Sequence, residues 1–321
     1  MFKMFWTPFI ATLVAAVAVS GTAQAEFPDK PITLVVPSGA GGGLDLSARV
    51  LTSVISNHIG VPMTVKLVPG AAGQVGTAEV SRAKADGYTL LYTADVTDQI
   101  PQFVASVPYD SNRDFTALAQ LSTARFSFVV LSKSPFKTLK DLMDHARTNP
   151  GKVKLAHSGQ WGPSMLMGGS LFGLNKLKVN YIAYRGGGPS MQALLSGDAD
   201  FTGQVPSVIT AQGDRVRALA TAGDKRVFKD VPTTTELGFP DVYGVVRFIV
   251  LGLRNTPADR VQKLRKAFSD VQKDKTYVKL MKRIGSNADY IGGDAYERDI
   301  RPKQKVFFKK LVNELTGGKA R

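Results

Sequence analysis

The segment Pro37-Ser38-Gly39-Ala40-Gly41-Gly42-Gly43 decides the fold, because it joins an apolar run at 32–36 to a helical pattern at 44–58. In the second range, apolar residues recur at the three- and four-residue spacing of one helix face, and Gly60 ends the pattern. A strand that passes through a short glycine-rich loop directly into a helix is typical of a parallel, doubly wound α/β sheet.

The same order of strand, loop and helix recurs along the chain. The further strands that we expect are 63–68, 88–92, 126–131, 153–156, 179–184, 199–204 and 216–221. Two more glycine-rich loops, 158–162 and 186–188, also precede expected helices. Ligands of open α/β sheets lie outside the carboxyl ends of the strands, where helix N-termini favour anions. The three loops therefore predict an anion site, with tight turns between strand and helix as the alternative interpretation.

The first 25 residues have the pattern of a secretion signal that is cleaved after Ala25. Lys3 gives a basic start, 10–19 is apolar, and Ala23-Gln24-Ala25 is a small-residue cleavage site. The apolar run is too short to span a membrane. We therefore expect a periplasmic mature chain, 26–321, which is long enough to form two domains.

The chain is basic and contains no cysteine. Its 41 Lys and Arg against 26 Asp and Glu give a formal net charge of +15 at pH 7. The missing thiols exclude a disulfide scaffold, thiolate metal sites and cysteine nucleophiles. A basic chain suits nucleic acid, an anionic membrane surface or an anionic solute. Export argues against nucleic acid and against NAD or ATP chemistry, so we expect no cofactor, no metal and no nucleic-acid partner.

The sequence does not match the motifs of nucleotide binding and catalysis that it partly resembles. A dinucleotide fingerprint that begins at Gly39 would need Gly or Ala where Leu44 stands. No G-x-S-x-G occurs, since 168–172 misses it at the last position. Ser158 lies beside His157 in sequence but has no evident acid to orient the histidine. An exported hydrolase of an anionic ester is therefore only an alternative.

Two side chains beside the loops have a structural and a functional interpretation. Asp45 either stabilises the first helical turn and pairs with Arg49, or holds a ligand ammonium or a water. Trp161 either forms an apolar wall over a ligand or anchors its own loop. The lysine-rich segment 303–310 predicts a helix with one packed face, and a helix on a membrane surface is the alternative.

Several short motifs follow one another over nearly the whole mature chain. They are Phe27-Pro28-Asp29-Lys30-Pro31-Ile32, Pro37 to Asp45 with Ala48-Arg49, Pro69-Gly70-Ala71-Ala72-Gly73 with Gly76, Asp86-Gly87-Tyr88-Thr89-Leu90-Leu91, Tyr184 to Pro189, Leu194 to Asp200, and Val231 to Pro240. In this order and spacing, behind a secretion signal, they resemble the Bug family, the periplasmic solute-binding proteins of tripartite tricarboxylate transporters.

This resemblance implies an α/β type II periplasmic binding-protein fold, in which two domains close over a small carboxylate. Each domain would be a mostly parallel sheet flanked by helices. Domain 1 would comprise 26–124 and 236–321, domain 2 would comprise 125–235, and two crossing strands would form the hinge. The ligand-binding residues that the resemblance implies are Gly41, Gly42, Gly43, Asp45, Ser158, Gly159, Gly162, Ser164, Tyr184 and Gly187.

Some positions depart from the pattern of the family. Ala94-Asp95 stand where small hydroxyl residues are common, and an Asp95 carboxylate that faces the cleft would favour a ligand with a positive group. Gln204 stands where an acid is expected, and Arg247-Phe248 where a tryptophan is common. Trp161 would enlarge or cap the pocket. The departures add Ala94, Asp95, Trp161 and Gln204 to the ligand-binding candidates.

We therefore expect a monomeric receptor without catalytic activity. It would capture a dicarboxylate, an amino acid or an aromatic carboxylate by domain closure and deliver it to the inner-membrane subunits of a cognate transporter. The alternative among binding proteins is a sensor component that presents its ligand to a signalling receptor.

Overall fold

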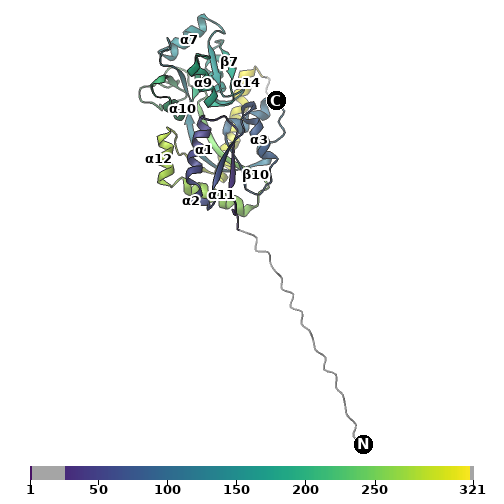
Figure 1. Ribbon diagram of the computed structural model, residues 1–321. Helices are drawn as coiled ribbons and strands as arrows, with labels where there is room; N and C mark the ends of the chain where they lie inside the picture. The colour runs from purple at the N-terminus through teal and green to yellow at the C-terminus, as the bar shows by residue number, and fades with distance from the viewer. Residues whose placement is uncertain (2–25, 319–321) are drawn as a thin grey trace.

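The computed structural model describes Met1 and residues 26–318. The predicted secretion signal and its cleavage site after Ala25 therefore lie outside the described residues, apart from Met1. Two sheets form the core of the described part (Figure 1). We call the six-stranded sheet with its helices the first lobe, and the five-stranded sheet with its helices the second lobe. None of the described helices has both the length and the apolar character needed to cross a bilayer.

The sheet of the first lobe has the strand order β11-β4-β10-β3-β1-β2. Its strands are β1 (Ile32–Val36), β2 (Met63–Leu67), β3 (Thr89–Ala94), β4 (Phe115–Arg125), β10 (Val245–Leu253) and β11 (Ile291–Gly292). β1 pairs parallel with β2 and β3, whereas β10 is antiparallel to both β3 and β4. Three of the inner strands, β1, β3 and β10, are mostly apolar because helices cover both faces of the sheet.

The sheet of the second lobe has the order β7-β6-β8-β5-β9. Its strands are β5 (Ser127–Leu131), β6 (Lys154–His157), β7 (Asn180–Ala183), β8 (Phe201–Gln204) and β9 (Val216–Thr221). β6 pairs parallel with β7 and β8, and β5 is antiparallel to β8 and β9. The two sheets share one plan, in which three parallel strands are followed by an antiparallel strand that enters from the other lobe. Both sheets are therefore mixed.

The helices follow the strands in the order expected for repeated β-α-β units. In the first lobe they are α1 (Gly43–Val54), α2 (Ser56–Ile59), η1 (Ala71–Gly73), α3 (Gln74–Ser81), α4 (Asp95–Gln99), α5 (Pro101–Val104), α6 (Ser111–Asp114), α11 (Ala258–Val271), α12 (Lys275–Arg283), α13 (Gly293–Ala295), η4 (Tyr296–Ile300) and α14 (Arg301–Thr316). In the second lobe they are α7 (Leu139–Thr148), α8 (Pro163–Gly168), η2 (Gly169–Gly173), α9 (Gly187–Ser196), α10 (Pro206–Thr210) and η3 (Gly213–Arg215). The predicted α/β class is confirmed.

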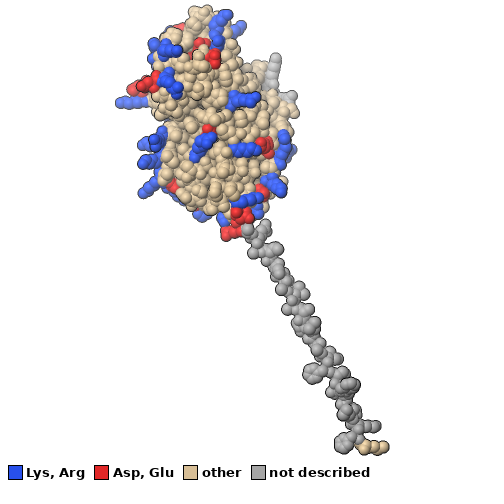
Figure 2. Space-filling view, viewed as in Figure 1, with Lys and Arg blue, Asp and Glu red and all other residues tan. Residues whose placement is uncertain are grey.

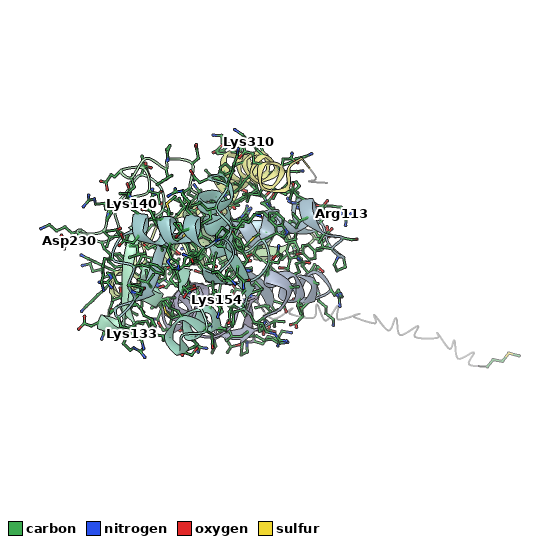
Figure 3. The ribbon with its side chains drawn as sticks, turned by 90° about the horizontal axis from the view of Figure 1, so that it is seen from above. Arg113, Lys133, Lys140, Lys154, Asp230 and Lys310 are labelled. Atoms are coloured by element: carbon green, nitrogen blue, oxygen red, sulfur yellow. The ribbon has the colours of Figure 1, made fainter. Side chains whose placement is uncertain are left out.

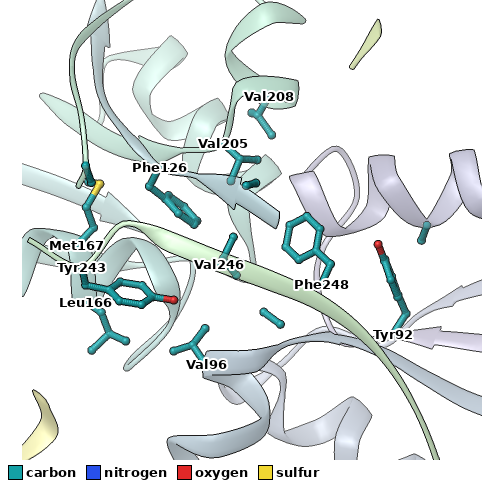
Figure 4. Packing of buried hydrophobic residues seen from close by; sticks show 14 of the residues in the cluster. Tyr92, Val96, Phe126, Leu166, Met167, Val205, Val208, Tyr243, Val246 and Phe248 are labelled. Atoms are coloured by element: carbon teal, nitrogen blue, oxygen red, sulfur yellow. The ribbon is translucent and has the colours of Figure 1, made fainter. Parts of the chain in front are cut away.

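The chain crosses between the lobes twice, and the two crossing segments lie side by side. The first crossing is Phe126, between β4 and β5, and the second is 222–244, between β9 and β10. The Phe126 N–H donates to the Gly244 carbonyl, and the Ala222 N–H donates to the Phe126 carbonyl, each at 2.8 Å. One hydrophobic cluster runs through both lobes along these segments (Figure 4).

Basic side chains outnumber acidic ones on the face of the molecule shown in Figure 2. They stand apart from one another instead of forming one continuous patch, and uncharged surface separates them. The net positive charge of the chain is thus spread over this face. A spread charge of this kind attracts small anions at long range and favours no single docking surface on the face shown.

Candidate functional site

A small cavity of about 70 Å³ lies between the two lobes, and we call it the front cavity. The first lobe contributes Pro37, Ser38, Gly43, Leu44, Ala72, Ala94 and Thr97 to its lining; the second contributes Ser158, Gly162, Pro163, Gly187, Gln204 and Val205; the crossing segments and β10 add Phe126, Val246 and Phe248. Figure 4 shows Phe126, Val246 and Phe248 between the lobes. All three glycine-rich loops that the sequence pattern singled out thus contribute to the lining.

The first wall of the front cavity is the N-terminus of α1. Gly42 is its N-cap and Gly43 its first residue, and the first N–H groups of any helix have no partner within the helix. Asp45 is buried, and its carboxylate accepts hydrogen bonds from the Gly41 N–H at 2.8 Å and from Arg49 Nε at 2.9 Å. Asp45 therefore pairs with Arg49, as its structural interpretation predicted, and in addition holds the Gly41 main chain, while Gly43 and Leu44 of the helix N-terminus line the cavity.

The second wall is the loop between β6 and α8. The Ser158 N–H donates to Ser164 Oγ at 2.8 Å, and that hydroxyl lies 2.9 Å from Ser158 Oγ, to which it donates. The buried His157 ring has its Nδ1 3.0 Å from the Gly159 carbonyl, so Nδ1 carries the proton. Burial lowers the pKa of His157, which keeps the ring neutral. His157 thus fixes the loop and makes no hydrogen bond that would activate Ser158.

The third wall is the N-terminus of α9, where Gln204 fixes the main chain. Gln204 is buried, and its amide nitrogen donates to the Gly187 carbonyl and to Ser190 Oγ, both at 2.9 Å. Gly186, the N-cap of α9, has φ 126°, a backbone conformation that favours glycine. The helix therefore begins at a defined place, with its N-terminus beside the front cavity.

Glycine loops of the two lobes touch each other directly. The Gly39 N–H donates to the Arg185 carbonyl at 2.8 Å, which links the lobes through main-chain atoms. A Cβ atom added to Gly188 would lie 1.9 Å from the Ala40 carbonyl oxygen, and one added to Gly42 would lie 3.3 Å from the Gly188 nitrogen. These approaches are possible only because no side chain stands between the two backbones. The structure is that of a closed cleft.

Most of the candidates predicted from the sequence lie at this cleft, and three do not. The structure brings Gly43, Ala94, Ser158, Gly162, Gly187 and Gln204 to the lining, with Gly41, Gly42, Asp45, Gly159 and Ser164 in the loops behind it. Trp161 is half-buried against the main hydrophobic cluster, and its backbone N–H contacts Met165 Sδ at 3.3 Å. Tyr184 packs against Ala156, Ala193 and Ala199. Both aromatic rings therefore pack against the protein, and neither residue belongs to the lining.

The placement of Asp95 differs from the expectation that its carboxylate faces the ligand cleft. Ala94 ends β3 and lines the front cavity, whereas Asp95 is the first residue of α4 and does not belong to that lining. Its buried carboxylate accepts hydrogen bonds from the Arg247 N–H at 3.1 Å, from the Val96 N–H at 2.9 Å and from Gln304 Nε2. Burial raises the pKa of Asp95 to about 6, against the opposing effect of the Arg247 guanidinium 3.5 Å away.

The residues that the sequence reasoning missed come from two sources. Ala72 belongs to a further glycine-rich loop, after β2, whose approach to Gly159 closes one side of the cleft. A fourth glycine loop at the end of a strand was the signal that could have found it. Phe126 belongs to the first crossing segment, and Val246 and Phe248 belong to β10; the positions of both depend on contacts between distant parts of the chain. Within residues 26–318, His, Asp and Glu side chains form no group of three that could hold a metal ion.

Two α/β lobes that are joined by paired crossing segments and closed on helix N-termini define the class of periplasmic solute-binding proteins. A family model described as the tripartite tricarboxylate transporter family receptor matches residues 47–314, and the chain belongs to this family. The resemblance to the Bug family is thereby confirmed. The chain is a solute-binding receptor of the tripartite tricarboxylate transporter type, a family of periplasmic binding proteins.

Similar proteins extend over nearly the full length of the chain. A curated protein of Cupriavidus necator, named for its place in the gbd 5' region, is 31% identical over 316 residues, which are 94% of this chain and 95% of that protein. The structure of the periplasmic binding protein BugD has a TM-score of 0.85 at 25% identity and covers 90% of this chain and 99% of its own. MatC of Rhodopseudomonas palustris, solved with bound malate, has a TM-score of 0.78 at 24% identity over 91% of this chain and 99% of its own.

Proposed function

We propose that this receptor captures a short organic carboxylate in the front cavity and carries it to the membrane subunits of its transporter. The observation that carries the proposal is the direct contact of glycine loops around a cavity flanked by the N-termini of α1 and α9. These N-termini offer unpaired N–H groups and partial positive charge to an anion. The malate bound to MatC, which has the same fold, supports a carboxylate as the ligand.

The size of the front cavity favours a ligand of few carbon atoms. Its 70 Å³ holds roughly five water-sized groups. No acidic side chain of the lining selects for an amine-bearing ligand, since Asp95 lies elsewhere. Two aromatic rings, Phe126 and Phe248, line the cavity, but its volume is well below the roughly 150 Å³ that a benzene ring occupies in an apolar cavity, so it does not favour an aromatic ligand. Among the ligand classes expected from the sequence, a short dicarboxylate is therefore the one that we propose.

Main-chain donors are sufficient for useful affinity. A hydrogen bond to a charged group contributes about 1.5–3 kcal/mol, so about six such bonds contribute roughly 9–18 kcal/mol. Loss of free motion on association costs about 4–15 kcal/mol. A net binding free energy near −8 kcal/mol corresponds to a dissociation constant of about 1 μM. Such affinity requires no charged side chain in the cleft.

We further propose the arrangement in which this capture takes place. The secretion signal is cleaved after Ala25, and the mature receptor acts in the periplasm as a monomer without catalytic activity. Residues 26–124 and 236–321 form one domain and residues 125–235 the other. The two sheets and the crossings at Phe126 and 222–244 support this division.

The experiment compares a variant that prevents closure with one that leaves it unaffected. In Gly188→Ala the new methyl group meets the Ala40 carbonyl of the other lobe, while the substitution suits the first turn of α9. In the control, Gly173→Ala, the methyl group makes an ordinary contact with Leu315. Each mature protein is unfolded, stripped of ligand, refolded and titrated calorimetrically with malate, succinate and citrate.

We expect the wild type and Gly173→Ala to bind at least one of these acids, and Gly188→Ala to bind it about 100-fold more weakly, because the lobes cannot complete the closed cleft. Circular dichroism should show the same fold in all three proteins. Unchanged affinity in Gly188→Ala would exclude the glycine contact as the site of capture. Failure of the stripped wild type to bind any short carboxylate would refute the proposed ligand class.

A further inference from the structure

A second and much larger cavity, of about 760 Å³, lies beside α14, and we call it the rear cavity. Most of its lining comes from α14 and from the segment 240–244 that ends the second crossing. The start of β10, Asp95 of α4, Ile300 of η4 and Leu174 of the second lobe complete it. A concave space of this size is within the range of small-molecule sites. It shares no lining residue with the front cavity.

The inner end of the rear cavity is polar. Asp95 and Arg247 form an ion pair there, 3.5 Å between Nη1 and Oδ2, and three hydrogen bonds to Asp95 complete the shell of its carboxylate. The Arg247 side chain is 31% exposed, and its Nε is buried without a hydrogen-bond partner. The contact with Asp95 therefore uses only part of the hydrogen-bonding capacity of the Arg247 guanidinium, whose remaining N–H groups can donate to a second anion.

The rear cavity also has an exposed apolar wall and a second cation. Phe307 is 49% exposed and Leu174 is 40% exposed, although both are large apolar side chains. The Phe307 ring packs on Phe308 with centroids 5.4 Å apart, so the wall is held in place. Lys303 lies on the same helix, and α14 runs along the outer edge of the molecule with Lys310 pointing outward (Figure 3).

We propose that the rear cavity is a second binding site, for an amphipathic monocarboxylate such as a medium-chain fatty acid or an arylalkanoic acid. The carboxylate is bound by Arg247 and Lys303, and the apolar body lies on Phe307 and Leu174. Exposed apolar groups next to unsaturated cationic donors are the complement of such a ligand. This inference does not depend on the ligand proposed for the front cavity, because the two linings share no residue.

Octanoate and 3-phenylpropanoate are suitable probes for the stripped and refolded mature protein. Acetate, which lacks the apolar body, and octan-1-ol, which lacks the charge, are the ligand controls. The test variants are Phe307→Ala and Lys303→Gln. Their matched controls are Val306→Ala and Lys305→Gln, which change exposed residues of the same helix that do not line the cavity.

We expect octanoate to bind, and Phe307→Ala to weaken its binding about tenfold through the lost apolar contact. Lys303→Gln should weaken binding about threefold, because a partly solvated charge contributes less. Val306→Ala and Lys305→Gln should bind as the wild type does, and acetate and octan-1-ol should bind at least tenfold more weakly than octanoate. Gly188→Ala should retain octanoate binding, which separates this site from the front cavity.

Three results would overturn the proposal. They are absence of octanoate binding, equal effects of Phe307→Ala and Val306→Ala, or octanoate binding that Gly188→Ala abolishes and Phe307→Ala leaves intact. The last result would place octanoate in the front cavity. If malate fails to bind but octanoate binds with the expected dependence on Phe307 and Lys303, the proposed function fails and the second site stands.

Discussion

The front and rear cavities differ in the part of the protein that faces a ligand. Among the described residues that line the front cavity, none carries a charge, and the main chain of glycine loops and helix N-termini lies beside apolar side chains such as Phe126 and Phe248. The lining of the rear cavity includes six acidic and basic side chains, namely Asp95, Asp241, Arg247, Lys303, Lys310 and Glu314. The groups that can bind an anion are main-chain N–H groups in the front cavity and side chains in the rear cavity. Main-chain N–H groups do not titrate, whereas the side chains do.

The largest effect that we expect is a loss of folding stability when the ion pairs of Arg301 at the start of α14 are removed. Arg301, the first residue of α14, is 3% exposed in its side chain and contacts Asp98 at 3.1 Å and Glu297 at 3.1 Å. Arg301→Met leaves the buried Asp98 carboxylate without its partner, and such a loss costs about 3–5 kcal/mol of the free energy of unfolding. Urea unfolding followed by circular dichroism measures this cost.

The control for Arg301 is an arginine whose ion pair is exposed. Arg113, 75% exposed in its side chain, pairs with Asp114, so Arg113→Met should change the free energy of unfolding by less than about 1 kcal/mol. Adding Asp98→Asn to Arg301→Met removes the unpaired charge and should restore part of the lost stability. If Arg301→Met and Arg113→Met lowered the free energy of unfolding equally, the buried Arg301–Asp98 pair would contribute no more to stability than the exposed Arg113–Asp114 pair.

The next effect is a pH dependence that originates at the rear cavity. The pKa of Asp95 is about 6 in the folded protein, above the 3.8 of an unperturbed carboxyl, so the folded state binds this proton more tightly than the unfolded state. Ionisation of Asp95 therefore destabilises the folded protein as the pH rises from about 4 to about 6. The free energy of unfolding of the wild type, relative to Asp95→Asn, should fall by about 3 kcal/mol over this interval.

Urea unfolding of both proteins at pH 4, 5, 6 and 7 gives the difference directly, because the variant keeps every other titrating group. A difference that stays constant, or that rises with pH, would contradict the raised pKa of Asp95.

The smallest effect is expected at the front cavity, where affinity for a carboxylate should hardly depend on pH. The lining is uncharged, His157 stays neutral because burial lowers its pKa, and a short carboxylate is ionised above pH 6. Calorimetric titration with the best-bound acid should give dissociation constants within about threefold of one another between pH 6.5 and 8.5. A change of tenfold or more would place a titrating side chain in the binding step.

Local patterns were sufficient to predict much of the fold. Apolar runs identified β1, β2, β3 and the five strands of the second lobe, and the glycine loops after β1, β6 and β7 placed the main walls of the cleft. β4 was missed because FTALAQLSTAR mixes small and polar residues without alternation, although it is buried along most of its length. β10 was missed although VVRFIVLGL is rich in β-branched and apolar residues, which is a local strand signal.

In the site, too, contacts between residues that are close in sequence could be predicted, and contacts between distant residues could not. Asp45 and Gly41 are four residues apart, so a local argument could foresee their contact. Asp95 and Arg247 are 152 residues apart, and both drew attention as departures from the family pattern. The sequence could not show that they form one ion pair, nor that β3 ends at Ala94 and Asp95 begins α4 outside the lining of the cleft. The pairing of β10 with β3, which places Phe248 opposite Ala94, brings Arg247 next to Asp95.

The paired crossing segments also determine what kind of motion the molecule can make. Because Phe126 is hydrogen-bonded to both Gly244 and Ala222, the segments bend together, and a twist of one lobe against the other would break these bonds. We therefore expect the lobes to open by a hinge rotation about the two crossing segments, which a single angle describes. A single distance between the lobes then reports the whole movement, and since the chain has no native cysteine, one introduced pair of labelled cysteines can measure it.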